Sequence, residues 1–105
     1  MGVRLGRSDR PALLSQDRFI QPLGAVRLAN RGYVEITRGN WSESLRLSLE
    51  SIQIDPSLPE AHTNAGVAYY KLGNFAAAID EWKKSLALRP DEKVRGLLRK
   101  VSSTP

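Results

Sequence analysis

The residues that could carry out acid–base or metal chemistry are few and scattered along the chain. There is no cysteine and one histidine, His62, so disulfides, thiolate metal sites and a pair of imidazoles are excluded. The acids include two adjacent pairs, Asp80-Glu81 and Asp91-Glu92. Neighbours along a helix point in different directions, so neither pair forms a facing dyad. We expect no enzyme activity, no metal site and no cofactor, and we interpret His62 as a packed or partly exposed residue.

Two asparagines stand out among the remaining polar residues. Asn30 and Asn64 each occur in an Asn-x-Gly sequence, and they lie 34 residues apart. A side-chain amide offers both a donor and an acceptor, as a peptide unit does. The same residues also suit a purely structural role inside a helix pair, and this alternative remains open.

The second asparagine belongs to a stretch, residues 59–92, with two helical patterns separated by Gly73-Asn74. Apolar residues recur at i, i+3, i+4 and i+7 on both sides, which predicts two antiparallel helices joined by a tight turn. Gly73 is expected to end the first helix through a positive φ, and Asn74 to cap the second. The residues of the apolar pattern are Ala61, Ala65, Ala68, Tyr69, Leu72, Phe75, Ala78, Ile79, Trp82 and Leu86.

Residues 25–58 repeat this organisation at a shift of 34 residues. Gly32 aligns with Gly66, Gly39 with Gly73, Asn40 with Asn74 and Pro56 with Pro90. A fixed period of this length is typical of a solenoid of helix pairs. Asn40 is therefore expected to cap its helix as Asn74 does, with Glu43 completing a capping box.

The pattern resembles the tetratricopeptide repeat family. Residues 59–92 carry it as His62-x2-Ala65-Gly66-x2-Tyr69, Ala78-x3-Trp82 and Pro90. Residues 25–58 share its glycines, Trp41 and Pro56 but depart from it at Arg31, Glu35, Ser44 and Ser48. Mid-helix Gly32 and Gly66 predict a close approach by the neighbouring helix, with Ser44 and Ala78 as the small residues opposite. Trp41, Phe75 and Trp82 are expected to pack between helices.

The resemblance implies an all-α fold, a right-handed superhelical stack of antiparallel helix pairs. We expect one domain at residues 25–101, made of repeats 25–58 and 59–92 and a capping helix at 91–101. Residues 1–24 are expected to form a mobile leader or a short helix, and residues 102–105 a frayed tail.

The resemblance also implies a function, which is non-enzymatic binding of a peptide or partner protein on the concave groove lined by the first helix of each pair. In some members of the family, similar asparagines form a ladder that hydrogen-bonds an extended peptide. A chaperone-tail clamp is not expected, because Ala29, Tyr33, Thr63 and Val67 replace the basic and amide residues that it requires. The expected partner-binding residues are Asn30, Tyr33, Ile36, Thr63, Asn64, Val67, Tyr70 and Lys71, in a strip that also contains Val26, Ala29, Thr37 and Glu60.

Charge leaves two alternatives. The net charge is +5 and the pI about 10.0, but residues 25–92 are nearly neutral, while residues 93–105 hold four basic residues and no acid. Nucleic-acid or acidic-partner binding through the basic ends is therefore disfavoured but open. Self-association as a homodimer or oligomer is the other alternative, because two repeats are few for a stable array. No apolar run is long enough to cross a membrane, and we expect a cytoplasmic protein.

Overall fold

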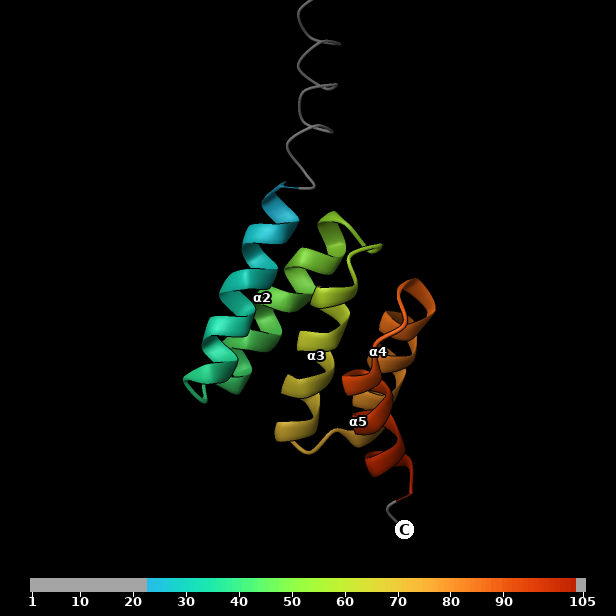
Figure 1. The fold of residues 1–105 in the computed structure, drawn as a ribbon. Helices are drawn as coiled ribbons and strands as arrows, with labels where there is room; N and C mark the ends of the chain where they lie inside the picture. The colour runs from blue at the N-terminus through green and yellow to red at the C-terminus, as the bar shows by residue number, and fades with distance from the viewer. Residues whose placement is uncertain (1–22, 104–105) are drawn as a thin grey trace, which may run out of the picture.

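The computed structural model describes residues 23–103, and its regular structure in that range is entirely helical (Figure 1). The predicted leader therefore lies outside the described residues except for residues 23 and 24. These two are already helical, so the predicted boundary at residue 25 falls inside a helix. The helices are residues 23–37, α2 (Trp41–Ile54), α3 (Pro59–Lys71), α4 (Phe75–Leu88) and α5 (Glu92–Ser102).

The helices form two antiparallel pairs and a final single helix. Residues 23–37 pair with α2, α3 pairs with α4, and α5 packs on α4 (Figure 1). Consecutive elements are stacked side by side, which is the expected arrangement of a helical solenoid. The sequence placed the last helix at residues 91–101, and α5 begins and ends within one residue of those bounds.

The turns inside the two pairs use glycine in the left-handed region. Gly39 has φ 79° and Gly73 has φ 89°, as predicted. The next amides, of Asn40 and Asn74, donate to Glu35 O at 2.9 Å and Tyr69 O at 2.8 Å. This i to i−5 bond closes a Schellman turn, so each helix ends abruptly and the chain reverses within three residues.

The first pair is held together by small residues and backbone contacts. Ser44 Oγ donates to Gly32 O at 2.8 Å, and Ser51 Oγ donates to Ala25 O at 2.7 Å. Between them, Ser48 is buried with no hydrogen-bond partner for its Oγ. A Cβ placed on Gly32 would lie 2.9 Å from this Oγ. The predicted close approach at Gly32 is therefore confirmed, with Ser48 as the nearest side chain and the Ser44 backbone oxygen beside it.

The second pair is packed around Trp82, which is almost fully buried. Its indole Nε1 donates to Thr63 O at 3.2 Å, and a Cβ on Gly66 would lie 2.3 Å from the same nitrogen. The close approach is confirmed here too, but the group opposite Gly66 is Trp82 instead of Ala78. Glycine is required because the flat indole ring lies directly on the α3 backbone.

Phe75 does not pack between helices, so that prediction is wrong. It is the first residue of α4, at the end of the pair, and it remains 49% exposed. The centroid of its ring lies 5.4 Å from that of Tyr70 on α3.

The apolar core continues from the second pair into α5. Val94 and Val101 are buried together with Ala78 and Trp82, and the partly buried Val67 and Tyr70 pack against this cluster. The opposite side of α5 is basic, with Arg99 and Lys100 exposed. Helix α5 therefore covers the apolar side of the second repeat and exposes its basic side chains to solvent, which is the role of a capping helix.

Candidate functional site

The predicted groove is hollowed between residues 23–37 and the start of α3. A cavity of about 220 Å³ is lined there by Val26, Ala29, Asn30, Leu58 and Glu60. Next to it Tyr33 is 59% exposed, and Val26 is also exposed. Val26, Asn30 and Tyr33 follow helical spacing, so they share one face of the first helix. This face offers apolar surface, one phenol and one amide to a ligand.

The two asparagines have different environments. Asn30 is exposed, whereas Asn64 is buried and its Nδ2 donates to Ala29 O at 2.9 Å. The expectation that both amides face the groove alike is wrong, because the first helix covers Asn64 whereas no helix of residues 23–103 covers Asn30. Asn64 joins the first helices of the two repeats, and one of its two amide N–H donors is used for this bond within the chain.

Two other predicted groove residues on α3 also make contacts within the chain. Thr63 Oγ1 and Ser85 Oγ lie 2.7 Å apart, which links α3 to α4. Lys71 is exposed, and its Nζ lies 5.3 Å from the centroid of the Trp41 ring, within the range of a cation–π contact.

The remaining predicted residues, Ile36, Val67 and Tyr70, are partly buried. The Tyr70 ring lies between two other aromatic rings, with centroids 5.4 Å from Phe75 and 6.2 Å from Trp82. Val67 and Tyr70 belong to the edge of the core that α5 covers. The exposed members of the predicted set are thus Asn30 and Tyr33 on the first helix and Lys71 at the end of α3.

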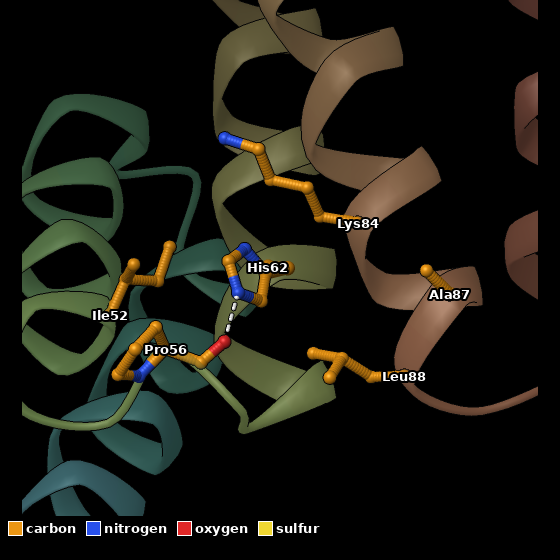
Figure 2. A pocket seen from close by; sticks show the side chains of 6 residues that line it. All are labelled: Ile52, Pro56, His62, Lys84, Ala87 and Leu88. Atoms are coloured by element: carbon orange, nitrogen blue, oxygen red, sulfur yellow. Dashed lines mark hydrogen bonds between the residues drawn. The ribbon is translucent and has the colours of Figure 1, made fainter.

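A second hollow lies where the two repeats meet, away from the groove residues. This open hollow of about 370 Å³ is lined by side chains of α2, α3, α4 and the turn at Pro56, with His62 at its centre (Figure 2). Sequence reasoning missed this hollow; the only signal was a histidine at the position where the family pattern has tryptophan. The lining residues are Ile52, Pro56, His62, Lys84, Ala87 and Leu88.

His62 connects three elements at this point. Its Nε2 lies 2.7 Å from Pro56 O, and its Nδ1 lies 2.7 Å from Glu81 Oε1. Lys84 Nζ lies 3.2 Å from Asp80 and 3.6 Å from Glu81. The Asp80 carboxylate, with Glu81 beside it, raises the pKa of Lys84. His62 is buried and both ring nitrogens are engaged, so it holds the repeats together and is not placed to act on a ligand.

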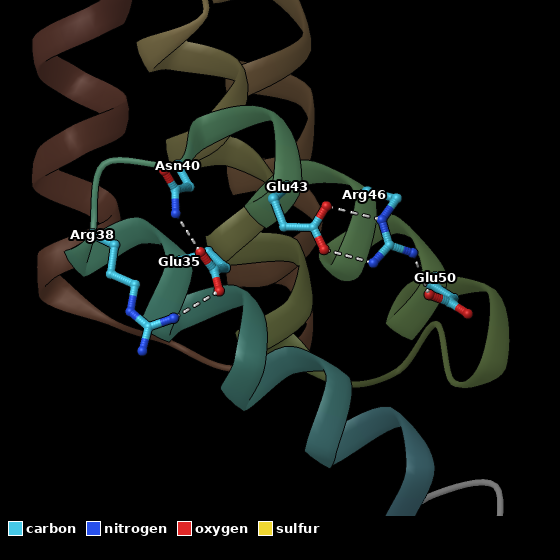
Figure 3. Close-up of polar contacts among 6 residues, drawn as sticks. All are labelled: Glu35, Arg38, Asn40, Glu43, Arg46 and Glu50. Carbon is cyan, nitrogen blue, oxygen red and sulfur yellow. Dashed lines mark hydrogen bonds and ion pairs between the residues drawn. The ribbon is translucent and has the colours of Figure 1, made fainter.

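A polar network covers the outside of the first repeat (Figure 3). Glu35 accepts from Arg38 at 3.3 Å and from Asn40 Nδ2 at 2.7 Å. Glu43 binds Arg46 through both oxygens, and this hydrogen-bonded guanidinium lowers the pKa of Glu43. Arg46 also reaches Glu50 at 3.4 Å.

This network overturns the capping prediction for α2. The Asn40 side chain makes no capping hydrogen bond, and Glu43 is committed to Arg46. In the second repeat Asn74 does cap α4, accepting from Ala77 N at 3.2 Å, as predicted. The two asparagines behave differently because of the residue five positions before each of them. Glu35 attracts the Asn40 amide, whereas Tyr69 has no carboxylate to attract that of Asn74.

Within residues 23–103 no group of acidic or histidine side chains is arranged to hold a metal ion. In the same range no helix is long and apolar enough to cross a membrane.

Comparison with known proteins agrees with this architecture. A tetratricopeptide repeat model matches residues 59–92, and a TPR repeat model matches residues 32–73. Together they span more than half of the chain, which belongs to the tetratricopeptide repeat family. The fold and family are those of a protein–protein interaction module.

Two similar proteins can be named. A stretch of 65 residues, 61% of this chain, is 37% identical to the protein CTR9 homolog of Arabidopsis thaliana, but it spans 6% of that protein. The N-terminal domain of stress-induced protein-1 (STI-1) from C. elegans has a similar fold, with a TM-score of 0.67 at 16% identity. That match covers 97% of this chain and 87% of the STI-1 domain.

Proposed function

We propose that this chain is a non-enzymatic module that binds an extended segment of a partner protein in its groove, chiefly through the first repeat. The observation that carries the proposal is the exposed face of Val26, Asn30 and Tyr33 beside the 220 Å³ hollow. An exposed tyrosine next to a free amide provides an apolar contact and a backbone hydrogen bond in one place.

The second repeat contributes a supporting wall to this groove. Thr63, Asn64, Val67 and Tyr70 each contact other parts of the chain, so they shape the groove more than they bind in it. Glu60 lies at the rim of the hollow and is paired with Arg89 at 2.7 Å. The rim charge is neutralised, which favours a partner segment whose central residues are uncharged.

The test is a selection of peptides from a random library by the intact chain, followed by affinity measurements on the selected peptides. Asn30→Ala combined with Tyr33→Ala should weaken binding by roughly tenfold or more, as expected for loss of a central aromatic anchor. Lys83→Ala is the matched control, because Lys83 is exposed on α4 with no contact to the groove. Peptides that bind the double variant as tightly as the unmodified chain would contradict the groove assignment.

A further inference from the structure

The exposed large apolar side chains of residues 23–103 are unevenly distributed. Leu23 is 58% exposed and Val34 is 42% exposed, and both lie on the first helix together with the groove residues Val26 and Tyr33. Leu23 and Val34 fall in line with Arg27 and Arg31 by helical spacing, and this line runs directly beside the groove residues. We call Leu23, Arg27, Arg31 and Val34 the N-terminal stripe.

The repeat register shows why this stripe is uncovered. On α3 the positions equivalent to Arg27, Arg31 and Val34 are Ala61, Ala65 and Ala68. These three alanines are fully buried, and α3 packs against α2 of the first repeat. Two arginines and a valine are too large for the same close contact, so the stripe does not fit another hairpin of this type.

The arginines of the stripe have no close partner in the described part of the chain. Neither makes a hydrogen bond or an ion pair there, and Arg31 acts on Glu43 only through a weak electrostatic effect. Every carboxylate between residues 23 and 103 is already engaged by a cation, a hydroxyl or a backbone amide. These carboxylates are Glu35, Glu43, Glu50, Asp55, Glu60, Asp80, Glu81, Asp91 and Glu92.

The stripe could be covered by a second copy of this chain, by residues 1–22 or by a different protein, and the distribution of charge favours one of these. A second copy has no unengaged carboxylate to offer from its described residues. Residues 1–22 carry four arginines against two aspartates, so their net charge has the same sign as that of the stripe. The complementary occupant is a different protein that presents carboxylates beside apolar side chains.

We propose that the N-terminal stripe docks an acidic amphipathic helix of a partner protein, at a surface beside the groove. Apolar side chains of that helix would pack on Leu23 and Val34, and carboxylates of the same face would pair with Arg27 and Arg31. The stripe runs along nearly the whole described length of the first helix, and a helix laid against it meets all four residues.

The test uses the full chain and a synthetic helical peptide with leucines on one face and glutamates next to them. Binding is followed by fluorescence anisotropy. We expect Arg27→Glu with Arg31→Glu to weaken binding by roughly tenfold or more, and raising salt from ~50 to ~200 mM to weaken binding to the unmodified chain. The same peptide with glutamine in place of glutamate should bind at least several-fold more weakly.

The matched control is Lys83→Glu with Lys93→Glu, which changes net charge equally at exposed cations on α4 and α5. This control should bind nearly as the unmodified chain does, and circular dichroism should show that both variants remain helical. An equal loss of peptide binding in both variants would mean that the peptide is attracted to any basic protein surface. That result would overturn the proposal that the stripe is the docking site.

Three further outcomes separate the alternatives. Loss of peptide binding in the Asn30→Ala, Tyr33→Ala variant would place the peptide in the groove and overturn the proposal. Peptide binding that is retained in this variant supports docking on the stripe. Binding that appears only after residues 1–22 are deleted would show that the chain covers its own stripe, which contradicts the proposal. A third result would be that single-stranded DNA displaces the peptide and that Arg27→Glu abolishes binding of both peptide and DNA. That pair of observations would assign the stripe to nucleic acid instead.

Discussion

Asn64 on α3 donates its side-chain amide to the backbone oxygen of Ala29 on the first helix, at 2.9 Å. The bond runs from the second repeat to the first, so it fixes how the two groove-lining helices lie against each other. The residue at the equivalent position of the first repeat, Asn30, is exposed and has no preceding helix to reach in the part of the chain that the structure describes.

The two asparagines therefore differ in what their removal costs. Asn64→Ala should lower the free energy of unfolding by about 1–2 kcal/mol, because a buried hydrogen bond and its packing are lost. Asn30→Ala should change it by less than about 0.5 kcal/mol, since the side chain is exposed. Urea unfolding of the two variants compares them directly, and equal stabilities would contradict the distinction.

Gly66 and Gly96 should respond oppositely to the same substitution. Gly66→Ala inserts a methyl group into the Trp82 ring and should cost about 3 kcal/mol or more, because neither the ring nor the backbone can move aside. Gly96 lies inside α5 with nothing within 4 Å of an added Cβ. Gly96→Ala should stabilise by about 0.5–1 kcal/mol through helix propensity. Thermal unfolding followed by circular dichroism measures both, and a destabilised Gly96→Ala variant would show an unrecognised contact at α5.

The buried serines of α2 provide a third comparison. Ser48→Ala removes a hydroxyl without a partner, so stability should stay equal or rise by up to about 1 kcal/mol. Ser51→Ala removes the bond to Ala25 O and should lower stability by about 0.5–1.5 kcal/mol. The urea midpoint of each variant, compared with that of the unmodified chain, shows whether stability rises or falls. If Ser48→Ala were the more destabilising change, the Ser48 hydroxyl would have a partner.

The His62–Glu81 contact predicts an unequal effect of removing its two members. Pro56 O can only accept, so His62 Nε2 donates to it, and the Nδ1 contact needs a hydrogen on Nδ1 or on the carboxylate. Glu81→Gln supplies an amide N–H to a neutral imidazole and should cost about 1 kcal/mol or less. His62→Ala empties the junction and should cost about 3 kcal/mol or more. Denaturant unfolding would contradict this picture if Glu81→Gln were the more harmful change.

Asp55 gives a prediction for pH. The Ser57 hydroxyl at 2.6 Å, and then the Ser57 amide at 3.0 Å, lower the pKa of Asp55. A folded-state pKa below the unfolded value means that this carboxylate contributes stability above its ordinary pKa and loses it as pH falls through the folded value. Ser57→Ala should therefore be less stable than the unmodified chain near neutral pH, and the gap should narrow in acid. A gap that stays constant across pH would contradict this assignment.

Local chemistry was sufficient to predict much of the helix arrangement. Gly39 and Gly73 indicated the turns because only a residue without Cβ adopts positive φ at no cost. Gly66 indicated a close helix contact for a different reason, because a residue without Cβ lets a neighbouring side chain lie on the helix backbone. The sequence was misleading where two local options competed, as at Asn40, whose amide could cap α2 or reach Glu35 and does the latter.

The candidate site was predicted less well than the fold. Helical spacing located the face that contains Asn30 and Asn64 but could not show that a neighbouring helix covers one and leaves the other exposed. The hollow around His62 was missed, because its walls come from three helices and a turn.

By itself, the sequence determined an all-helical chain, two repeats, the turns between their helices and the family to which they belong, because these depend on residues close together along the chain. Only the tertiary structure decided which polar groups remain available to a partner. Exposure depends on what packs against each helix, and the first helix has no preceding repeat to cover it within the described residues.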